Sequence, residues 1–419
     1  MNTEKRDADV LIVGGGVIGL TCAEALSRAG RAVTVIDQGE LGRGSSWANC
    51  GLITPSHALP LALPGLPAKT LKSMLHGDAP FYIKPRLDAS MLVWGLRFFA
   101  ACNLDRARRT AKAKQALLAL SRHRLEELIA KESVDCEWTD AGLYFVYKTP
   151  QAFAAGDLED RLLLELGIEC EKLDGAELSR REPAVRPGMT GARFYPIDAH
   201  LRPDKLVSGL VTRLRARGVT FHENCRLVEL VGDATQISSA LTSIGEFRVR
   251  DVVIAGGAWT PALVKQLGVT LPIQPGKGYS ITIDRPVGAP RAPLIFKERS
   301  VAVTPWESQL RIGSTMEFSG YDSTLNRARL DAIRRGAREY MHASIDGGRQ
   351  TEWYGWRPMT PDDLPVIGAT PRYPNVTITA GHGMLGVSMS TGSAELVAAL
   401  VCGVKPPVDP TPYSPLRFR

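Results

Sequence analysis

The residues near the N-terminus whose types and spacing suggest chemistry are the glycines of Gly14-Gly15-Gly16-Val17-Ile18-Gly19 and, 23 residues after Gly14, the carboxylate of Asp37. In this spacing Gly14 permits a tight turn, Gly16 lets the backbone approach a pyrophosphate, and Gly19 lets a helix pack closely on a strand. Asp37 can accept hydrogen bonds from a ribose diol and would repel a 2′-phosphate, which disfavours NADP. The pattern therefore predicts a dinucleotide site; the alternative is an ordinary turn between a strand and a helix.

These residues need a strand, a helix and a second strand to hold them. The apolar run 9–13 predicts the first strand, the helical spacing over 17–29 the helix, and residues 33–37 the second strand, which together have the length of a parallel crossover. Because free N–H groups and a positive dipole end face the turn, the start of this helix suits phosphate binding. Helices are also expected at 105–132, 203–217, 325–344 and 386–402, and strands at 141–147, 192–195, 219–230, 247–255, 278–284 and 310–317.

The segment after Asp37 separates FAD from NAD. Residues 42–52, Gly-Arg-Gly-Ser-Ser-Trp-Ala-Asn-Cys-Gly-Leu, are short, polar and glycine-rich, which suits further contacts to pyrophosphate and isoalloxazine. With this segment the sequence resembles the D-amino-acid oxidase superfamily of flavoproteins and, within it, the bacterial D-amino-acid dehydrogenases. The resemblance extends over essentially the whole chain, and its other specific stretches are 62–65, 276–280, 355–362 and 381–386.

The resemblance implies an α/β (α+β) fold in which a Rossmann-like FAD-binding domain is interleaved with a substrate domain containing a mostly antiparallel sheet. The predicted cofactor domain is discontinuous and comprises residues 1–60, 195–262 and 353–419. The predicted substrate domain comprises residues 61–194 and 263–352, and the flavin is expected to lie between the two domains.

The resemblance also implies which residues hold FAD. Those expected to bind the cofactor, by side chain or backbone, are Gly14, Gly16, Val17, Gly19, Asp37, Gln38, Arg43, Ser45, Ser46, Asn49, Gly51, Leu52, Val228, Gly256, Gly257, Trp259, Gly355, Gly381, Gly383, Met384, Leu385 and Gly386. For Val228 the alternative is an ordinary strand valine.

Arg357, in Gly355-Trp-Arg-Pro358, corresponds to the arginine that pairs with the substrate carboxylate in this superfamily. A guanidinium fits this role because its planar fork matches a carboxylate. The alternative is an ion pair with Asp362 or Asp363. Tyr279 could add a hydroxyl to the same carboxylate, or it could be a core tyrosine.

Three further basic residues are weaker candidates for catalysis. His382 lies in a turn that mainly supports the flavin in this superfamily, so a direct role in proton transfer is the less favoured interpretation. His57 is weaker still. Lys277 is expected near the flavin edge but as a solvated lysine.

The chemistry implied is oxidation of a small D-amino acid to its imine or 2-oxo acid, with a hydride passing to flavin N5. The last helix, expected to begin near Gly386, would direct its positive end at the flavin ring. Substitutions at Trp47, Met384 and Val387-Ser388 relative to the dehydrogenases suggest D-proline or a hydroxy-D-proline in place of D-alanine. The resemblance implies that the electrons pass to a quinone at the membrane surface or to another acceptor that is not oxygen.

The composition fits this class. The chain has 419 residues, 44% hydrophobic and 23% charged, and no window apolar enough to span a bilayer. No apolar signal sequence precedes the first strand, so we expect a cytoplasmic enzyme, peripheral on the inner face of the membrane if its acceptor is a quinone. The seven scattered cysteines disfavour a disulfide framework and a metal site. No nucleic-acid partner is expected, whereas an oligomer or partner subunits remain open.

Residues 59–101 are the segment expected to approach a membrane, helped by the basic stretch 104–124, whose alternative is a solvated helix face. Other functions stay open at this point. They are a glycine- or sarcosine-type oxidase that uses oxygen, a flavoprotein subunit or assembly factor without chemistry of its own, and oxidation of a 2-hydroxy acid.

Overall fold

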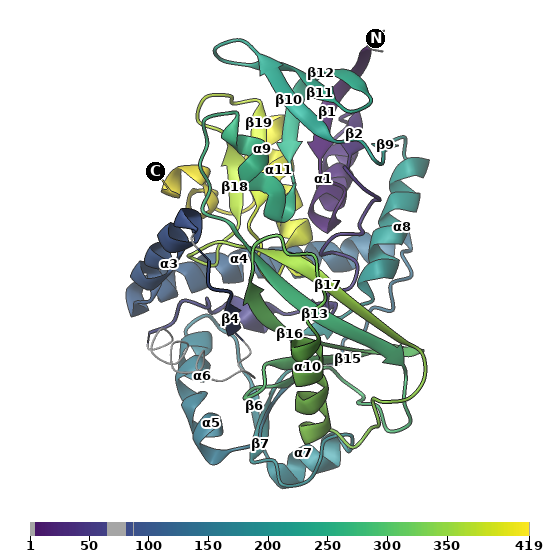
Figure 1. Cartoon of the computed structure of the whole chain (residues 1–419), viewed down its shortest axis with the longest axis vertical. Coiled ribbons are helices and arrows are strands. Elements are labelled where there is room, and N and C mark those ends of the chain that lie inside the picture. The colour runs from purple at the N-terminus through teal and green to yellow at the C-terminus, as the bar shows by residue number, and fades with distance from the viewer. Residues whose placement is uncertain (1–4, 65–80, 87, 419) are drawn as a thin grey trace.

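A computed structural model describes residues 5–64, 81–86 and 88–418 of the chain (Figure 1). In these residues the chain forms a pair of large sheets, which lie one above the other in the view of Figure 1 and are covered by helices. Chain segments from the N-terminus, the middle and the C-terminus build the first sheet, and the intervening segments build the second. The predicted fold class, a Rossmann-like unit interleaved with a mostly antiparallel domain, is confirmed.

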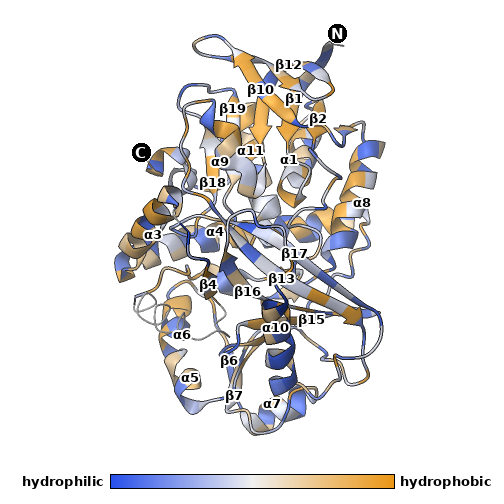
Figure 2. Ribbon diagram, viewed as in Figure 1, coloured by the Kyte–Doolittle hydropathy of each residue, from blue (hydrophilic) through white to orange (hydrophobic). Residues whose placement is uncertain are grey.

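The first sheet has a parallel centre in the order β19-β12-β1-β2-β9. An antiparallel meander of β10 and β11 continues from β12, and β18 runs antiparallel to β19. The strands are β1 (Lys5–Val13), β2 (Val33–Ile36), β9 (Thr220–His222), β10 (Leu227–Gly232), β11 (Ile237–Thr242), β12 (Gly245–Ile254), β18 (Val366–Ala369) and β19 (Val376–Ala380). Figure 2 shows these strands largely in orange, as expected for a parallel sheet that is covered on both faces.

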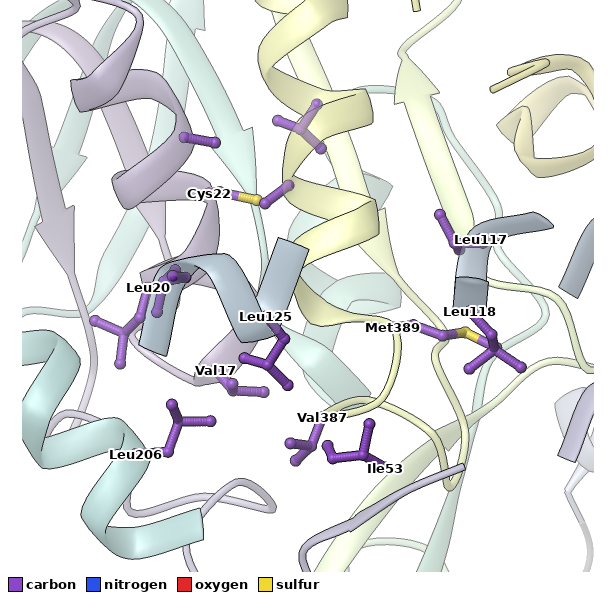
Figure 3. Packing of buried hydrophobic residues seen from close by; sticks show 14 of the residues in the cluster. Val17, Leu20, Cys22, Ile53, Leu117, Leu118, Leu125, Leu206, Val387 and Met389 are labelled. Atoms are coloured by element: carbon purple, nitrogen blue, oxygen red, sulfur yellow. The ribbon is translucent and has the colours of Figure 1, made fainter. Parts of the chain in front are cut away.

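Helices from distant parts of the chain cover this sheet in layers. Helices α1 (Val17–Arg28), α9 (Thr260–Lys265) and α11 (Ser390–Cys402) contact its strands, α4 (Leu104–Glu132) packs on α11, and α8 (Pro203–Ala216) packs on α1. Figure 3 shows part of the apolar core here, a cluster that includes Val17 and Leu20 of α1, Leu125 of α4, Leu206 of α8 and Val387. Thus α4, although it falls in the predicted substrate segment 61–194, packs on the cofactor domain.

The second sheet has nine strands in the order β17-β13-β16-β15-β14-β5-β7-β6, with β4 beside β16. All neighbours are antiparallel except β14 with β5 and β16 with β4. The strands are β4 (Phe81–Ile83), β5 (Leu143–Tyr147), β6 (Glu171–Asp174), β7 (Gly191–Tyr195), β13 (Gln274–Asp284), β14 (Leu294–Phe296), β15 (Val301–Pro305), β16 (Gln309–Phe318) and β17 (Gln350–Met359). The predicted boundary at residue 353 therefore falls inside β17, a strand of this sheet.

Helix α10 (Arg327–Tyr340) covers one face of the second sheet, and its outer side is largely blue in Figure 2. Shorter elements complete the domain and its connections. They are α5 (Pro150–Ala155), α6 (Asp157–Leu164), α7 (Gly175–Arg181), the pair β3 (Leu52–Ile53) and β8 (Ala199–His200), and the 3-10 turns η1 (Pro55–Ala58), η2 (Gly257–Trp259), η3 (Thr411–Tyr413) and η4 (Pro415–Phe418).

Helix α3 (Ala89–Ala101) lies at the edge of the molecule near the C-terminus (Figure 1). Its apolar side chains Leu92, Val93, Leu96 and Phe99 are exposed, whereas Trp94 is buried. Residues 65–80 of the segment predicted to approach a membrane, and with them Gly65 of the 62–65 stretch, lie outside the described residues. In the described portions of the chain, no helix combines the length and the apolar character needed to cross a bilayer.

Candidate active site

A cavity of about 990 Å³ is lined by residues of both large sheets and of the loops between them. Of the residues predicted to bind cofactor or substrate, all but Gly19, Val228 and Gly381 line it. The structure thus brings together residues from the start, the middle and the end of the chain. A cavity of this size, with an apolar wall and a few polar groups, is of the kind that holds a cofactor.

The glycine turn at one end of the cavity fits a dinucleotide. Gly14 has φ +114°, and a Cβ there would lie 2.4 Å from the carbonyl oxygen of Ala255. Gly19 lies behind the turn, where a Cβ would come within 1.8 Å of the Gly14 oxygen. No other residue type fits at either position without displacing backbone. The turn between β1 and α1 is therefore open to the cavity on one side and closely packed on the other.

Asp37, at the end of β2, stands beside this turn. One of its carboxylate oxygens accepts the N–H of Gly15 (2.7 Å) and the other accepts the N–H of Gly39 (2.9 Å). A carboxylate oxygen accepts more than one hydrogen bond, so both retain capacity for a ribose diol. The neighbouring Gln38 also lines the cavity. The two backbone bonds fix the carboxylate in place before any ligand arrives.

The polar loop 42–52 connects this turn to the second sheet. The N–H of Val17 donates to Ser46 Oγ (2.9 Å), and Ser45 Oγ donates to the carbonyl of Trp356 (2.6 Å) in β17. Within the loop, Asn49 donates to the carbonyl of Ser46 (3.0 Å) and accepts the N–H of Gly51 (2.8 Å). These serine and asparagine side chains therefore hold the loop along the cavity wall, and their role toward FAD stays a prediction.

Val228 does not line the cavity, but its chain neighbours Arg226 and Leu227 do. The pairing of β10 with β11 shifts register between Leu227 and Glu229, so Val228 is the extra residue of a bulge. Its side chain is exposed. A contact to the adenine through the Val228 backbone, as predicted, remains compatible with this position.

Arg357 lies on the face of β17 that borders the cavity. Its Nη1 donates to the carbonyl of Thr315 (2.7 Å) on β16. Thr315 has φ +66° and sits in a bulge where two residues of β16 face Gly278 of β13. A Cβ on Gly278 would lie 2.2 Å from Nη1 of Arg357. The bulge in β16 and the absent side chain of Gly278 together form the recess that holds the guanidinium.

Neither acidic alternative pairs with Arg357. Asp362 forms an ion pair with Arg417 (2.8 Å), and Asp363 forms one with the buried Lys114 (2.7 Å). Among the described residues no carboxylate lies within ion-pair distance of Arg357. Burial lowers the pKa of its guanidinium from the usual value. A desolvated cation without an anion favours binding one, so the site is suited to a ligand carboxylate.

Tyr279 and Lys277 alternate with Gly276 and Gly278 along β13, so their side chains lie on the other face of the strand. The Tyr279 hydroxyl donates to Glu317 (3.1 Å) and the ring lies in the core under α10. The geometry therefore does not place this hydroxyl beside Arg357. Lys277 was expected to be solvated, but it is fully buried because two tyrosine rings and Glu317 surround it. Its ammonium group donates to the carbonyl of Thr324.

His382 lies on the turn after β19 and borders the cavity. Its Nε2 is 2.9 Å from Ser393 Oγ on α11, and burial lowers the pKa of the imidazole to about 3. A neutral ring engaged in this bond supports the turn, which agrees with the favoured expectation. Helix α11 begins at Ser390, four residues later than predicted, because residues 384–389 form turns that bring Met384, Leu385 and Gly386 to the cavity.

The sequence did not single out the far end of the cavity. Phe145, Tyr195, Ile295 and Ala302 form an apolar wall there, and Lys297 pairs with Glu159 (2.7 Å) at its edge. These residues come from β5, α6, β7 and the consecutive strands β14 and β15 with the turn between them. Only the tertiary fold brings them together, so no local pattern could have identified them.

A family model described as FAD dependent oxidoreductase (DAO) matches residues 9–400. The D-amino acid dehydrogenase of Vibrio cholerae is 33% identical over 408 residues, which are 96% of each chain. That of Bradyrhizobium diazoefficiens is 35% identical over 409 residues, again 96% of each chain. Among solved structures, glycine oxidase from Geobacillus kaustophilus has a TM-score of 0.76 at 23% identity and covers 98% of both chains.

The chain therefore belongs to the DAO family of FAD-dependent oxidoreductases. It is an enzyme of that family, and FAD is its cofactor. The glycine turn, the fixed Asp37 carboxylate and the polar loop 42–52 fit that cofactor.

Proposed function

We propose that the protein is a D-amino-acid dehydrogenase that binds its substrate through the carboxylate to Arg357. The observation that carries the proposal is the cavity-facing guanidinium of Arg357, which is desolvated and has no described carboxylate partner. Bidentate arginine–carboxylate pairs give both affinity and orientation. The identity of 33–35% to D-amino acid dehydrogenases over 96% of their length supports the choice within the family.

Bound FAD supplies the acceptor for the two electrons and the hydrogen removed from the substrate Cα. The residues of this chain bind and orient. Arg357 holds the carboxylate, with Thr315 fixing one guanidinium nitrogen. The apolar wall of Phe145, Tyr195 and Ile295 excludes water from the substrate end of the cavity.

Anaerobic mixing tests this activity. The purified yellow protein is exposed to D- and L-amino acids, prolines, sarcosine and 2-hydroxy acids, and the loss of flavin colour is followed. We expect D-amino acids to bleach the flavin fastest. Bleaching by L-amino acids or hydroxy acids alone would exclude the proposed activity.

Within the D-amino acids we propose a cyclic secondary amine, D-proline or a hydroxy-D-proline, as the substrate. Val387 lines the cavity with a small aliphatic side chain, and the resemblance implies an aromatic ring at the Val387-Ser388 position in the dehydrogenases. The next residue, Ser388, is turned away to donate to the carbonyl of Leu52 (2.9 Å). A higher kcat/KM for D-alanine than for D-proline would exclude this choice of substrate.

We also propose that electrons leave to a quinone at a membrane surface, through the face formed by α3. Trp94 and Phe98 of α3 line the cavity, while Leu92, Leu96 and Phe99 are exposed on the other side of the same helix. An apolar helix face of this kind can rest in the outer part of a bilayer. The helix therefore connects the cavity wall with the surface at which a lipid-soluble acceptor would arrive.

Flotation with anionic liposomes tests the α3 surface. The double change Leu96→Glu and Phe99→Glu should abolish flotation and lower the rate with a water-insoluble quinone, without changing anaerobic flavin reduction. Val287, which is 99% exposed in a distant loop, provides the matched control Val287→Glu. Unchanged flotation of the double variant, or turnover matched by steady peroxide formation, would contradict the proposed route.

A further inference from the structure

A chain of three polar side chains leads from the protein interior to the wall of the cavity. The carboxylate of Asp198 is fully buried, and the N–H of Ser56 donates to its Oδ1 (3.0 Å). The hydroxyl of Ser56 bonds to its Oδ2. The same Ser56 oxygen lies 3.4 Å from Nδ1 of His57, whose ring borders the cavity and tilts against Phe145 at 5.3 Å between centroids.

Hydrogen-bond capacity decides the direction of this chain. Burial raises the pKa of the Asp198 carboxyl to about 7, so at pH 8 the group is largely ionised. An ionised carboxylate only accepts, so the single hydroxyl hydrogen of Ser56 is then committed to Asp198. The Ser56 oxygen can then only accept from the neighbouring ring, which requires that Nδ1 of His57 carries the hydrogen. The other nitrogen, Nε2, is left with its lone pair, and it bonds to no described group of the chain.

Burial and two nearby cations keep the His57 ring neutral. Burial, with smaller contributions from the charges of Lys297 and Lys114, lowers the pKa of the imidazole to about 3. Lys297 is paired with Glu159 and Lys114 with Asp363, so both cations are held in place. A neutral ring with a free Nε2 is a hydrogen-bond acceptor and not a strong base.

We propose that His57 is the residue that recognises the substrate amine, by accepting an N–H hydrogen bond at Nε2, and that Ser56 and Asp198 position it by fixing its tautomer. The inference rests on the proposed function and deepens it. A bond in this direction leaves the lone pair of the amine free for imine formation. The opposite tautomer would donate to that lone pair and withdraw it.

Replacing the Asp198 carboxylate by a neutral group should reverse the direction of the hydrogen bonds from Asp198 to His57. A neutral group at this position can donate to the Ser56 oxygen, which frees the Ser56 hydroxyl to donate to His57 Nδ1. Asp198→Asn makes that change with little change in shape, and Ser56→Ala removes the connection. Glu182→Gln is the matched control, because Glu182 is a buried carboxylate that accepts backbone N–H bonds far from the cavity.

The ¹⁵N spectrum of ring-labelled holoenzyme at pH 8 tests the tautomer directly. The seven histidines allow the His57 signals to be assigned by their loss in His57→Leu. We expect hydrogen on Nδ1 in the wild type and in Glu182→Gln. We expect it on Nε2 in Asp198→Asn. The same tautomer in wild type and Asp198→Asn, or hydrogen on Nε2 in the wild type, would overturn the positioning role.

Substrate affinity tests the recognition role. The dissociation constant for a D-amino acid comes from the concentration dependence of anaerobic flavin reduction, and that for the same acid without its amine comes from competition. His57→Leu and, to a lesser extent, Ser56→Ala should weaken the amino acid, roughly tenfold for the loss of one hydrogen bond in His57→Leu. Asp198→Asn, whose ring would donate to the amine lone pair, should instead lower the rate constant for flavin reduction at saturating substrate. Affinity for the amine-free acid should not change.

Equal weakening of both ligands, or no weakening, would overturn the assignment of His57 to the amine. If no D-amino acid reduces the wild-type flavin while the His57 tautomer is as expected, the proposed function is wrong. The positioning of His57 by Ser56 and Asp198 is then still supported. The two failures are therefore separate observations on the same set of proteins.

Discussion

The guanidinium of Arg357 lies where the Cβ of any residue other than glycine at position 278 would be, with Nη1 2.2 Å from that point. Gly278 on β13 has no side chain, and the long side chain of Arg357 on the neighbouring strand β17 fills that space. The carbonyl of Thr315 then takes one N–H of the guanidinium from the third strand. The carboxylate-binding group is consequently held by sheet backbone and not by a mobile loop, which favours precise orientation.

Gly278→Ala is expected to push the guanidinium toward the cavity. Because a misplacement of about 1 Å at a substrate-binding group can lower turnover by up to 100-fold, we expect kcat/KM for a D-amino acid to fall roughly 10- to 100-fold. Stopped-flow reduction at several substrate concentrations measures it. The visible flavin spectrum should be unchanged.

Gly347→Ala serves as the control, because no atom lies within 4 Å of a Cβ at that position and Gly347 does not line the cavity. If Gly278→Ala retained wild-type kinetics, the close approach of Arg357 to β13 would have no functional consequence.

Gly14→Ala should weaken FAD binding. A residue with a Cβ at φ +114° is strained by about 1–3 kcal/mol, and the methyl group would also meet the Ala255 carbonyl oxygen. We expect the dissociation constant for FAD, measured by fluorescence quenching on addition to apoprotein, to rise by about 10- to 100-fold. Tight, unaltered FAD binding would place the cofactor away from this turn.

Asp198→Asn should raise stability at alkaline pH. Burial raises the pKa of the Asp198 carboxyl to about 7, against the hydrogen bonds from Ser56 and the positive charge of Arg122. The folded wild type thus binds this proton more tightly than the unfolded chain, so its stability falls as pH rises from about 4 to about 7. The loss is at most about 4 kcal/mol, since one pKa unit corresponds to about 1.4 kcal/mol.

The asparagine variant lacks this ionisation. Urea unfolding of holoenzyme should therefore show a gain for Asp198→Asn over the wild type at pH 8 and little difference at pH 4.5. An equal difference at both pH values would mean that the Asp198 carboxyl does not titrate in this range.

The sequence predicted the elements that carry strong local patterns. The strand–turn–helix of residues 9–29 and the long helix 105–132 appear within four residues of their expected ends, as β1 with α1 and as α4. The late start of α11 at Ser390 was missed because the sequence Gly-Val-Ser-Met of residues 386–389 carries no clear signal for the start of a helix. Helical spacing alone also could not show that α4 packs on the cofactor domain.

The candidate site was predictable where residues are close in sequence and not where strands bring them together. The polar loop 42–52 and the turn 381–386 reach the cavity as expected. Tyr279 was expected near the substrate carboxylate and Lys277 near the flavin edge in solvent, but alternation along β13 turns both side chains to the opposite face. The contact of Asp198 with Ser56, 142 residues apart, leaves no local pattern.

The role of Arg357 can be tested most directly by anaerobic flavin reduction in the wild type and Arg357→Ala, with a D-amino acid and with the corresponding amine that lacks the carboxylate. Loss of a charge-assisted bidentate pair is expected to weaken the D-amino acid by about 3 kcal/mol, or roughly 100-fold, in the rate constant divided by the dissociation constant. The amine should react equally slowly with both proteins. If Arg357→Ala and the wild type reduce at the same rate with the D-amino acid, Arg357 does not bind the substrate carboxylate.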